Sequence, residues 1–411
     1  MNHQAISPGF KSTDAGPIPN DWTVKKIGNF LPFLNGKAHE SFVSPSGSYV
    51  VVNSRFISTD GSVRKLCTIN LMPARVGDVL MVMSDLPNGR ALAKCFLVDR
   101  PDYYAVNQRV CIFRARKDDP RYLRYALNRN PYFLAFDDGV QQTHLLNDPI
   151  KNCPVILPPV PEQKGIAEAL SDVEAWIGSL ERLIEKKQGL KEGAAQALLT
   201  GEVRLPGIKN LPWVNLTIGD VSDVNPESLG AGTRPSYEFN YIALEDVDRG
   251  VLHNTSRQHY VSAPSRARRV LRDGDVLVST VRPNLKSHLL YRKQVRDAVC
   301  STGFTVVRCR SDRAIPEFLF NYIMSWEIDK QIERIIAGSS YPAISSGDVR
   351  GLQLRLPTVD EQRAIATVLS DLDAEIASLE QTAAKARDIK QGMMQQLLTG
   401  RVRLVQREAA A

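Results

Sequence analysis

The chain has 411 residues, of which 43% are hydrophobic and 24% charged, and its formal net charge is +7. This composition is typical of a globular protein, and the length predicts two to four domains that each bury a core. No run of about 18 apolar residues occurs, so we expect no membrane span, and the first residues lack the layout of a signal peptide. The six scattered cysteines predict free thiols and no metal site, as in a cytoplasmic protein.

The first part of the chain predicts a mixed α and β domain. Short β-rich runs bounded by Gly, Pro or Asp lie at residues 50–52, 78–83, 108–113 and 152–157. Apolar residues at helical spacing predict a helix over residues 121–128. The Asn-Pro pair at its end predicts a turn.

A long helix is predicted over residues 160–200, because Pro161 and Glu162 favour a first turn and Gly201 is a stop signal. Its apolar residues repeat every seven positions, which predicts a coiled-coil seam. About 38 residues at 1.5 Å each give a rod of about 57 Å, longer than a helix needs to cover one domain. The seam residues predicted in it are Ile166, Leu170, Val173, Ile177 and Leu180.

The segment 157–205 occurs again at 356–404. Both copies begin Leu-Pro-x-Val-x-Glu-Gln and end Leu-Leu-Thr-Gly-x-Val-Arg-Leu, and Glu162 and Glu361 are separated by the same 199 residues as Gly201 and Gly400. That period is too long for a solenoid. The sequence therefore predicts two tandem halves, each a variable domain followed by a near-constant helix.

The second half repeats the first in weaker matches as well. Trp213 matches Trp22, and Gly-Asp-Val-Leu occurs at 77–80 and 274–277. The paired tryptophans predict core packing. Helices are predicted over residues 317–336 and 359–399, and the seam residues of the second long helix are Ile365, Leu369, Leu372, Ile376 and Leu379. We expect the two long helices to pack against each other in antiparallel orientation.

The sequence lacks the motifs of several enzyme classes. It contains neither the Gly-rich cofactor loop and Asn/Asp-Pro-Pro-aromatic loop of an adenine methyltransferase nor a Gly-x-x-x-x-Gly-Lys-Ser/Thr phosphate loop. The Glu-Gln-Lys at 162–164 superficially resembles a nuclease motif, but a helix start explains it better. We therefore expect no catalytic residue and no cofactor in this chain, and interpret it as a binding and scaffolding protein.

The duplicated arrangement of Leu-Pro-x-x-x-Glu-Gln-x-x-Ile-Ala, a heptad helix and Leu-Leu-Thr-Gly resembles the specificity subunit of type I restriction–modification systems. The resemblance covers essentially the whole chain. It implies an α+β fold with two tandem mixed α/β target recognition domains, each followed by a long helix, and an antiparallel coiled coil of the two helices. The expected boundaries are 1–156 and 206–355 for the recognition domains, 157–205 and 356–404 for the helical spacers, and 405–411 for a tail.

The resemblance also implies function and partners. Each recognition domain is expected to read one half of a bipartite, asymmetric site in double-stranded DNA. The helices are expected to set the spacer and to bind two methyltransferase subunits, which bring S-adenosylmethionine and adenine-N6 methylation. Restriction subunits would add ATP- and Mg-dependent translocation and cleavage. Two alternatives stay open: a stand-alone or architectural DNA binder, and the recognition part of a fused methyltransferase–nuclease.

Candidate DNA contacts in the second domain lie in the segment after the second Gly-Asp-Val-Leu. Arg and Asn side chains suit guanine and adenine edges, whereas Lys and Ser more often contact phosphate. A solvated basic loop is the alternative. The candidates are Thr280, Arg282, Asn284 and Lys286, with a basic cluster of Arg266, Arg268 and Arg269 as possible phosphate contacts.

Further candidates lie in the first domain and in two loops at matching positions before the last predicted strand of each domain. After Gly77 the first domain departs from the pattern that follows Gly274, so we expect different side chains to approach DNA there. A plain turn is the alternative for the two loops. The candidates are Ser84, Asn88 and Arg90, then Gln141, Gln142 and Thr143 in the first loop, and Ser340 and Tyr341 in the second.

Overall fold

A computed structural model describes residues 8–86, 89–208, 211–337 and 342–404 and divides the chain into two compact units. Unit 1 contains the residues up to 180 and those from 382 on, and unit 2 contains residues 181–381. Each long helix therefore begins in one unit and ends in the other. No helix in the described part of the chain is long and apolar enough to span a membrane.

Unit 1 combines short strands with short helices, the start of one long helix and the end of the other. Its strands are β1 (Phe10–Thr13), β2 (Gly16–Pro19), β3 (Thr23–Lys26), β4 (Phe33–Asn35), β5 (Tyr49–Val52), β6 (Leu66–Cys67), β7 (Asp78–Val82), β8 (Ser84–Asp85), β9 (Cys95–Leu97), β10 (Tyr104–Val106), β11 (Val110–Arg114), β12 (Thr143–His144) and β13 (Pro154–Leu157). Its helices are α1 (Ile27–Phe30), α2 (Ser54–Ser58), α3 (Pro120–Leu127), α4 (Pro131–Leu134), α5 (Asn147–Asn152) and the first part of α6 (Val160–Thr200), with a 3-10 turn η1 (Glu40–Phe42).

Unit 2 has the same kind of composition. Its strands are β14 (Val214–Thr217), β15 (Ser222–Val224), β16 (Glu238–Ile242), β17 (Val247–Asp248), β18 (Val251–Leu252), β19 (Ser256–His259), β20 (Ala267–Val270), β21 (Val276–Ser279), β22 (Leu289–Leu290), β23 (Ala298–Ser301), β24 (Phe304–Cys309) and β25 (Gln353–Leu356). Its helices are α7 (Ile218–Val221), α8 (Pro316–Ile323), α9 (Trp326–Ile336), α10 (Ser346–Gly351) and the first part of α11 (Val359–Leu397), with 3-10 turns η2 (Leu244–Asp246) and η3 (Pro283–Leu285).

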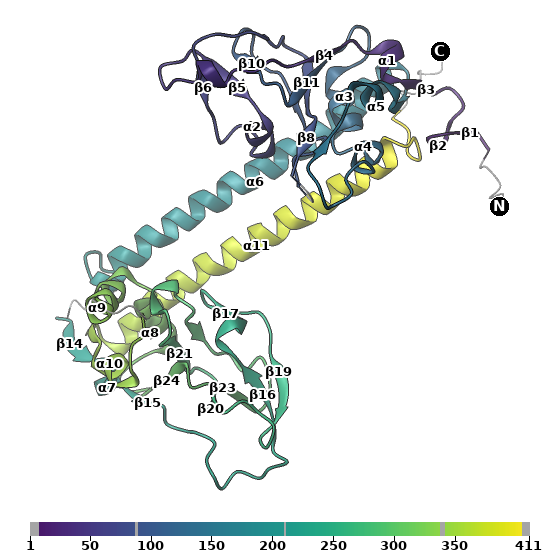
Figure 1. The fold of residues 1–411 in the computed structure, drawn as a ribbon. Coiled ribbons are helices and arrows are strands. Elements are labelled where there is room, and N and C mark those ends of the chain that lie inside the picture. The colour runs from purple at the N-terminus through teal and green to yellow at the C-terminus, as the bar shows by residue number, and fades with distance from the viewer. Residues whose placement is uncertain (1–7, 87–88, 209–210, 338–341, 405–411) are drawn as a thin grey trace, which may run out of the picture. The chain divides into compact units, whose positions relative to one another are not determined.

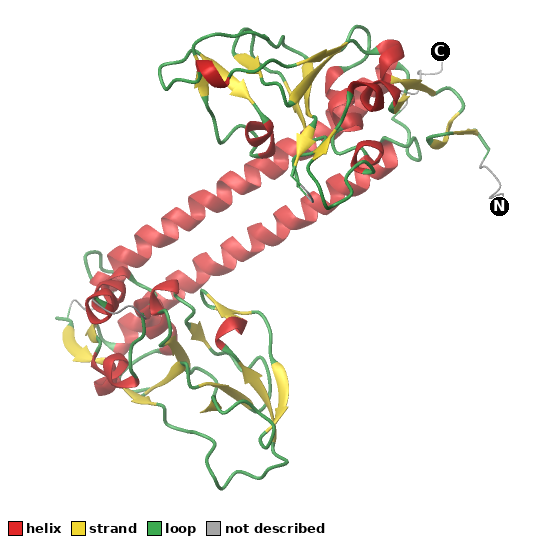
Figure 2. Cartoon of the chain, viewed as in Figure 1, coloured by secondary structure: helices red, strands yellow, loops and turns green. Residues whose placement is uncertain are grey.

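The sheet topology is duplicated. Unit 1 has an antiparallel sheet in the order β4-β11-β7-β9, and unit 2 has its counterpart in the order β15-β24-β21-β22. A parallel pair, β5 with β10 or β16 with β23, occurs in each unit, and so does a pair that joins the first and last strands, β3 with β13 or β14 with β25. In both units most short helices group beside the long helices (Figure 2). The tandem duplication predicted from sequence is therefore a duplication of fold.

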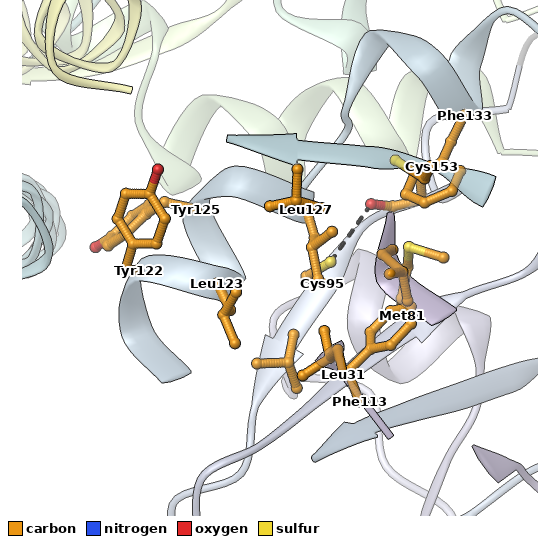
Figure 3. Close-up of a cluster of buried hydrophobic side chains, with 14 of the residues drawn as sticks. Leu31, Met81, Cys95, Phe113, Tyr122, Leu123, Tyr125, Leu127, Phe133 and Cys153 are labelled. Carbon is orange, nitrogen blue, oxygen red and sulfur yellow. Dashed lines mark hydrogen bonds between the residues drawn. The ribbon is translucent and has the colours of Figure 1, made fainter. Parts of the chain in front are cut away.

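The core of unit 1 lies between its four-stranded sheet and its helices. Met81 and Phe113 from the sheet pack with Leu127 of α3 and Phe133 of α4 (Figure 3). Ile166, Leu170 and Leu397 belong to this same core, although they come from α6 and α11. The domain core therefore includes residues of both long helices.

Three predicted elements differ from the structure. The helix predicted over 317–336 is two helices, α8 and α9, because Ser325 adopts an extended conformation and becomes the N-cap of α9. Asn130 does not merely end a helix: its side chain accepts a hydrogen bond from the Tyr132 amide at 3.0 Å and starts α4. The strand predicted from residue 152 begins only at Pro154, because α5 occupies the preceding residues.

The two long helices are present as predicted, with 41 residues in α6 and 39 in α11. Most of the predicted seam is buried. The buried members are Ile166, Leu170, Ile177, Leu180, Ile365, Leu369 and Ile376, and Val173, Leu372 and Leu379 are half-buried.

Contacts within each unit show that the helices run in opposite directions. In unit 1 the start of α6 lies beside the end of α11 (Figure 1), and Glu174 accepts a hydrogen bond from Lys390 Nζ at 2.6 Å. Burial would raise the pKa of Glu174, but the hydrogen bonds and charge of Arg124, with hydrogen bonds from Lys390 and Tyr125, lower it to about 2. In unit 2 Lys187 Nζ donates to Glu375 Oε2 at 2.8 Å. The seam is thus apolar near the helix starts and includes lysines paired with acids farther along.

A buried ion pair closes each unit. The helix-start Glu162 is 5% exposed and accepts hydrogen bonds from Arg403 Nε and Nη2, at 2.7 and 2.8 Å, and from Trp22 Nε1 at 3.0 Å. In unit 2 the fully buried Glu361 accepts two from Arg204, Nη2 at 2.6 Å. In each unit, the start of one long helix therefore binds the arginine that follows the other helix. We call these pairs the two clasps.

The glutamine after each clasp glutamate holds the helix start to the domain. Gln163 Oε1 accepts from the Asp119 amide at 2.9 Å and its Nε2 donates to Pro158 O at 2.9 Å. Gln362 makes the equivalent bonds to the Ile315 amide and to Pro357 O, each at 3.0 Å. The repeated Glu-Gln is therefore structural.

We expect Glu361→Ala to destabilise unit 2 by about 3 kcal/mol, because it leaves Arg204 partly buried without its carboxylate partner. The measurement is urea unfolding followed by circular dichroism. Asp360→Ala is the matched control: it removes the same charge from the same helical turn, but its ion pair with Arg363 is exposed. Equal losses in the two variants would contradict the role of the clasp.

Candidate nucleic-acid interface

Three segments of unit 1 meet where strand β7 ends. The Met83 amide donates to Arg109 O at 2.9 Å, which ties the end of β7 to the turn before β11. The Leu145 amide donates to Met83 O at 2.8 Å, which adds the segment after β12. Ser84 and His144 are opposite each other in the β8–β12 pair. We call this arrangement the three-segment junction.

Polar side chains surround a hollow at this junction. Its volume is about 510 Å³, and it is lined by Ser84, Gln108, Arg109, Gln142 and His144. Ser84 is buried, and its hydroxyl accepts a hydrogen bond from Gln142 Nε2 at 3.0 Å. The structure thus brings together two predicted candidates that lie 58 residues apart in sequence.

Unit 2 builds the same junction from the equivalent backbone. The Thr280 amide donates to Gly303 O at 2.8 Å, and the Ile344 amide donates to Thr280 O at 2.9 Å. The Arg282 amide donates to Pro342 O at 2.8 Å, which continues the pairing beyond Val281 and Ala343. The backbone hydrogen bonds that the Met83 amide and carbonyl make in unit 1 therefore have counterparts at Thr280 in unit 2.

The loop that follows this junction in unit 2 presents Arg282 and Asn284 to solvent. Arg282 and Lys286 both have left-handed backbone conformations, with φ of 47° and 57°. Non-glycine residues adopt this conformation at a cost, and such residues often occur at functional sites. Pro283 is buried and holds the loop between them.

Lys286 has partners within its own unit. Its ammonium lies 2.6 Å from Asp329 Oδ2 and 2.9 Å from Met324 O. Because α9 supplies Asp329, this ion pair fixes the loop to the helix. A phosphate contact, as predicted for Lys286, would compete with Asp329.

The other predicted residues differ in exposure. Thr143 is buried and its hydroxyl bonds Asp137 at 3.2 Å, and the Thr280 hydroxyl donates to Gly303 O at 2.7 Å. These two hydroxyls therefore form hydrogen bonds within their own domains. Besides Gln142, Arg282 and Asn284, the predicted contacts Arg90, Gln141 and Arg266 are exposed. Asn88, Ser340 and Tyr341 lie outside the described residues.

The remaining members of the basic cluster are half-buried. Arg268 lies over the Tyr260 ring, 4.9 Å from its centroid. Arg269 Nη1 donates to Ser228 Oγ at 3.0 Å. Of the three arginines in the cluster, only Arg266 is exposed, and exposure is what a phosphate contact requires.

Sequence reasoning missed Gln108 and Arg109 in the hollow. They occupy the turn between β10 and β11. The sequence feature that could have identified them is an amide and a basic side chain side by side, directly before a strand. Sequence reasoning also missed Asp85, the register equivalent of Arg282. The Asp85 carboxylate accepts from the Ala91 amide at 2.6 Å and closes its own loop.

His288 supports the junction of unit 2 from inside. It is 1% exposed, and its Nδ1 accepts a hydrogen bond from the Ser279 amide at 3.0 Å. Burial, assisted by the charge of Lys286, lowers the pKa of His288 to about 4. The described residues contain no group of three or more His, Cys, Asp or Glu that could hold a metal ion.

Comparison with known families agrees with this duplicated architecture. The family model for the type I restriction modification DNA specificity domain matches residues 19–191 and again residues 210–386. The chain belongs to this family. The two matched ranges each contain one three-segment junction and the strands that support it.

One relative in the family matches over nearly the full length and another over part of it. The specificity subunit of the type I restriction enzyme MjaVIII from Methanocaldococcus jannaschii is 24% identical, over 96% of each chain. That of HindI from Haemophilus influenzae is 26% identical over 40% of this chain and 36% of its own. The chain is thus a specificity subunit of a type I restriction–modification system, the DNA-recognition component.

Solved structures show the same fold. The S subunit from M. genitalium superposes with a TM-score of 0.59 at 15% identity, covering 95% of this chain and 98% of that one. A chain from a study of complex assembly and conformational transition of the type I system gives 0.53 at 19% identity, covering 94% and 99%. The predicted fold class is confirmed.

We expect the stability of unit 2 to fall by about 2 kcal/mol between pH 7 and pH 5, because of His288. Its folded pKa of about 4 lies below the ordinary 6.5, so the unfolded chain takes up a proton first. The contribution is complete above pH 6.5 and is lost as the pH falls toward 4. Urea unfolding at several pH values measures it. His288→Asn retains an acceptor for Ser279 and removes the titration, and an unchanged pH slope in this variant would contradict the assignment.

Proposed function

We propose that each recognition domain reads one half of a bipartite, asymmetric sequence in double-stranded DNA. The observation that carries this proposal is the repeated junction: its backbone hydrogen bonds are the same in both units, but its side chains differ. Two junctions with the same backbone arrangement can approach two segments of duplex in the same way, whereas their different side chains would contact different base edges. The net charge of +7 favours contact with the phosphate backbone.

We further propose that the long helices set the spacer between the half-sites and bind two methyltransferase subunits. A helix of 41 residues is about 60 Å long, more than the roughly 34–36 Å of one DNA turn. Methyltransferase subunits would bring S-adenosylmethionine for adenine methylation, and restriction subunits would bring ATP- and Mg-dependent cleavage. This chain would itself need no cofactor. We also propose that the chain acts in the cytoplasm, where it would meet DNA.

Two other functions give different experimental results. If the chain is the recognition part of a fused methyltransferase–nuclease, the fused protein would transfer methyl groups without separate subunits, whereas a specificity subunit requires its partners. A stand-alone architectural binder would not co-purify with a methyltransferase. Methyl-transfer assays on the chain alone and with co-expressed partners separate the three functions.

We expect specificity to be modular. Replacing residues 206–355 with the second recognition domain of another family member should change only one half of the methylated sequence, because the first domain retains its own junction. Methylome sequencing of cells that carry the hybrid complex reads both halves and the spacer. A hybrid that changes both halves would contradict independent reading.

Within the second domain we expect Arg282→Ala to weaken the cognate site by about 1–3 kcal/mol relative to random DNA, if the guanidinium contacts a guanine edge. Competition binding by the assembled methyltransferase measures the ratio. Arg296→Ala is the control, since it removes an equal charge from another exposed position of unit 2. Arg282→Lys retains the charge but not the paired donors. Equal weakening of cognate and random DNA would instead assign Arg282 to phosphate.

A further inference from the structure

We propose that Arg109, with Gln142 beside it, forms the base-reading site of the first recognition domain, and that Arg109 is the functional counterpart of Arg282. This inference rests on the proposed function, namely that each domain reads one half-site. The expected ligands are a guanine edge for Arg109 and an adjacent adenine edge for Gln142, because these are the bases whose paired acceptors and donors match the two side chains.

The register of the two junctions shows why sequence comparison does not pair these arginines. Ser84 and His144 are opposite each other in unit 1, as Val281 and Ala343 are in unit 2. One position farther on, Asp85 therefore occupies the place of Arg282. Asp85 closes its loop through backbone amides and offers no cation.

Unit 1 supplies its arginine from the opposite side of the same junction. Arg109 lies in the turn whose carbonyl accepts from Met83, and the corresponding turn in unit 2 accepts from Thr280 through Gly303. A glycine there cannot reach a base, whereas an arginine can. Each junction thus has an exposed arginine beside it, Arg109 in unit 1 and Arg282 in unit 2, and the two come from different segments.

The surroundings of Arg109 suit base edges better than phosphate alone. The hollow is lined by amide, hydroxyl, imidazole and guanidinium groups, all able to form directional hydrogen bonds. Ser84 fixes the Gln142 amide through Nε2, which leaves its Oε1 to accept from an exocyclic amine. A side chain held in this way loses little freedom on binding.

The test uses the assembled methyltransferase and the motif identified by methylome sequencing. Binding is measured on duplexes with the cognate sequence, with single base changes in the first half-site, and with single changes in the second. Arg109→Ala should reduce the preference for the correct first half-site roughly 5- to 100-fold and leave discrimination in the second half-site unchanged. Gln142→Ala should relax a neighbouring position of the same half.

Two further variants make the result specific. Arg116→Ala removes the same charge just beyond the other end of β11 and should alter no base preference. Arg109→Lys retains the charge for phosphate contact but loses the two parallel donors, so it should resemble Arg109→Ala in discrimination. Thermal unfolding of each variant identifies any loss of fold.

The outcomes separate this inference from the proposed function. Equal weakening of all sequences by Arg109→Ala, restored by Arg109→Lys, would assign Arg109 to phosphate and overturn the inference, while modular reading would stand. Unchanged discrimination in both half-sites would overturn it as well. A parent complex with no sequence preference would contradict the proposed function itself.

Discussion

The buried clasps are the constraint on which the rest of the structure depends. A carboxylate as enclosed as Glu361 is tolerated only when a cation and hydrogen bonds replace its water. Arg204 meets that demand with two bonds, and it stands directly after the other long helix. Because the clasp acid begins one helix and its arginine follows the other, neither unit is closed by its own helix alone. Each compact unit therefore combines residues from both halves of the sequence.

This combination of halves explains which parts of the fold were predictable. The duplicated motifs and the heptads predicted two halves and two long helices, because hydrophobic periodicity and helix-stop signals are local. The partner of Glu162 was not predicted, since Arg403 lies 241 residues away. Its place in the repeated Val-Arg-Leu sets it apart from most arginines, but the repeat does not say which acid it binds. The break between α8 and α9 was missed because Ser325 is acceptable both within a helix and as the N-cap of a new one.

The candidate interface was less predictable than the fold. The predicted Ser84 and Gln142 do meet, because the loops before the last strands follow the same scaffold in both halves. Lys286 proved to be tied to Asp329 on α9, and that contact depends on how a helix packs, which the loop sequence does not encode. Arg109 was overlooked because sequence alignment pairs positions by chain order, whereas a binding surface is assembled from side chains that reach one place from several segments.

The same distinction explains how such a fold can change specificity without losing stability. The amides and carbonyls of Met83 and Thr280 make their junction hydrogen bonds with other backbone groups, so these bonds constrain the exposed side chains around each junction very little. Surface substitutions away from caps, buried pairs and cores usually change stability by less than about 0.5 kcal/mol. The clasps, the glutamines beside them and the buried His288 are instead held by specific side-chain bonds. Sequence variation is therefore tolerated at the exposed side chains around each junction, where base edges would be read. It is destabilising at the clasps, which hold each domain to the helices.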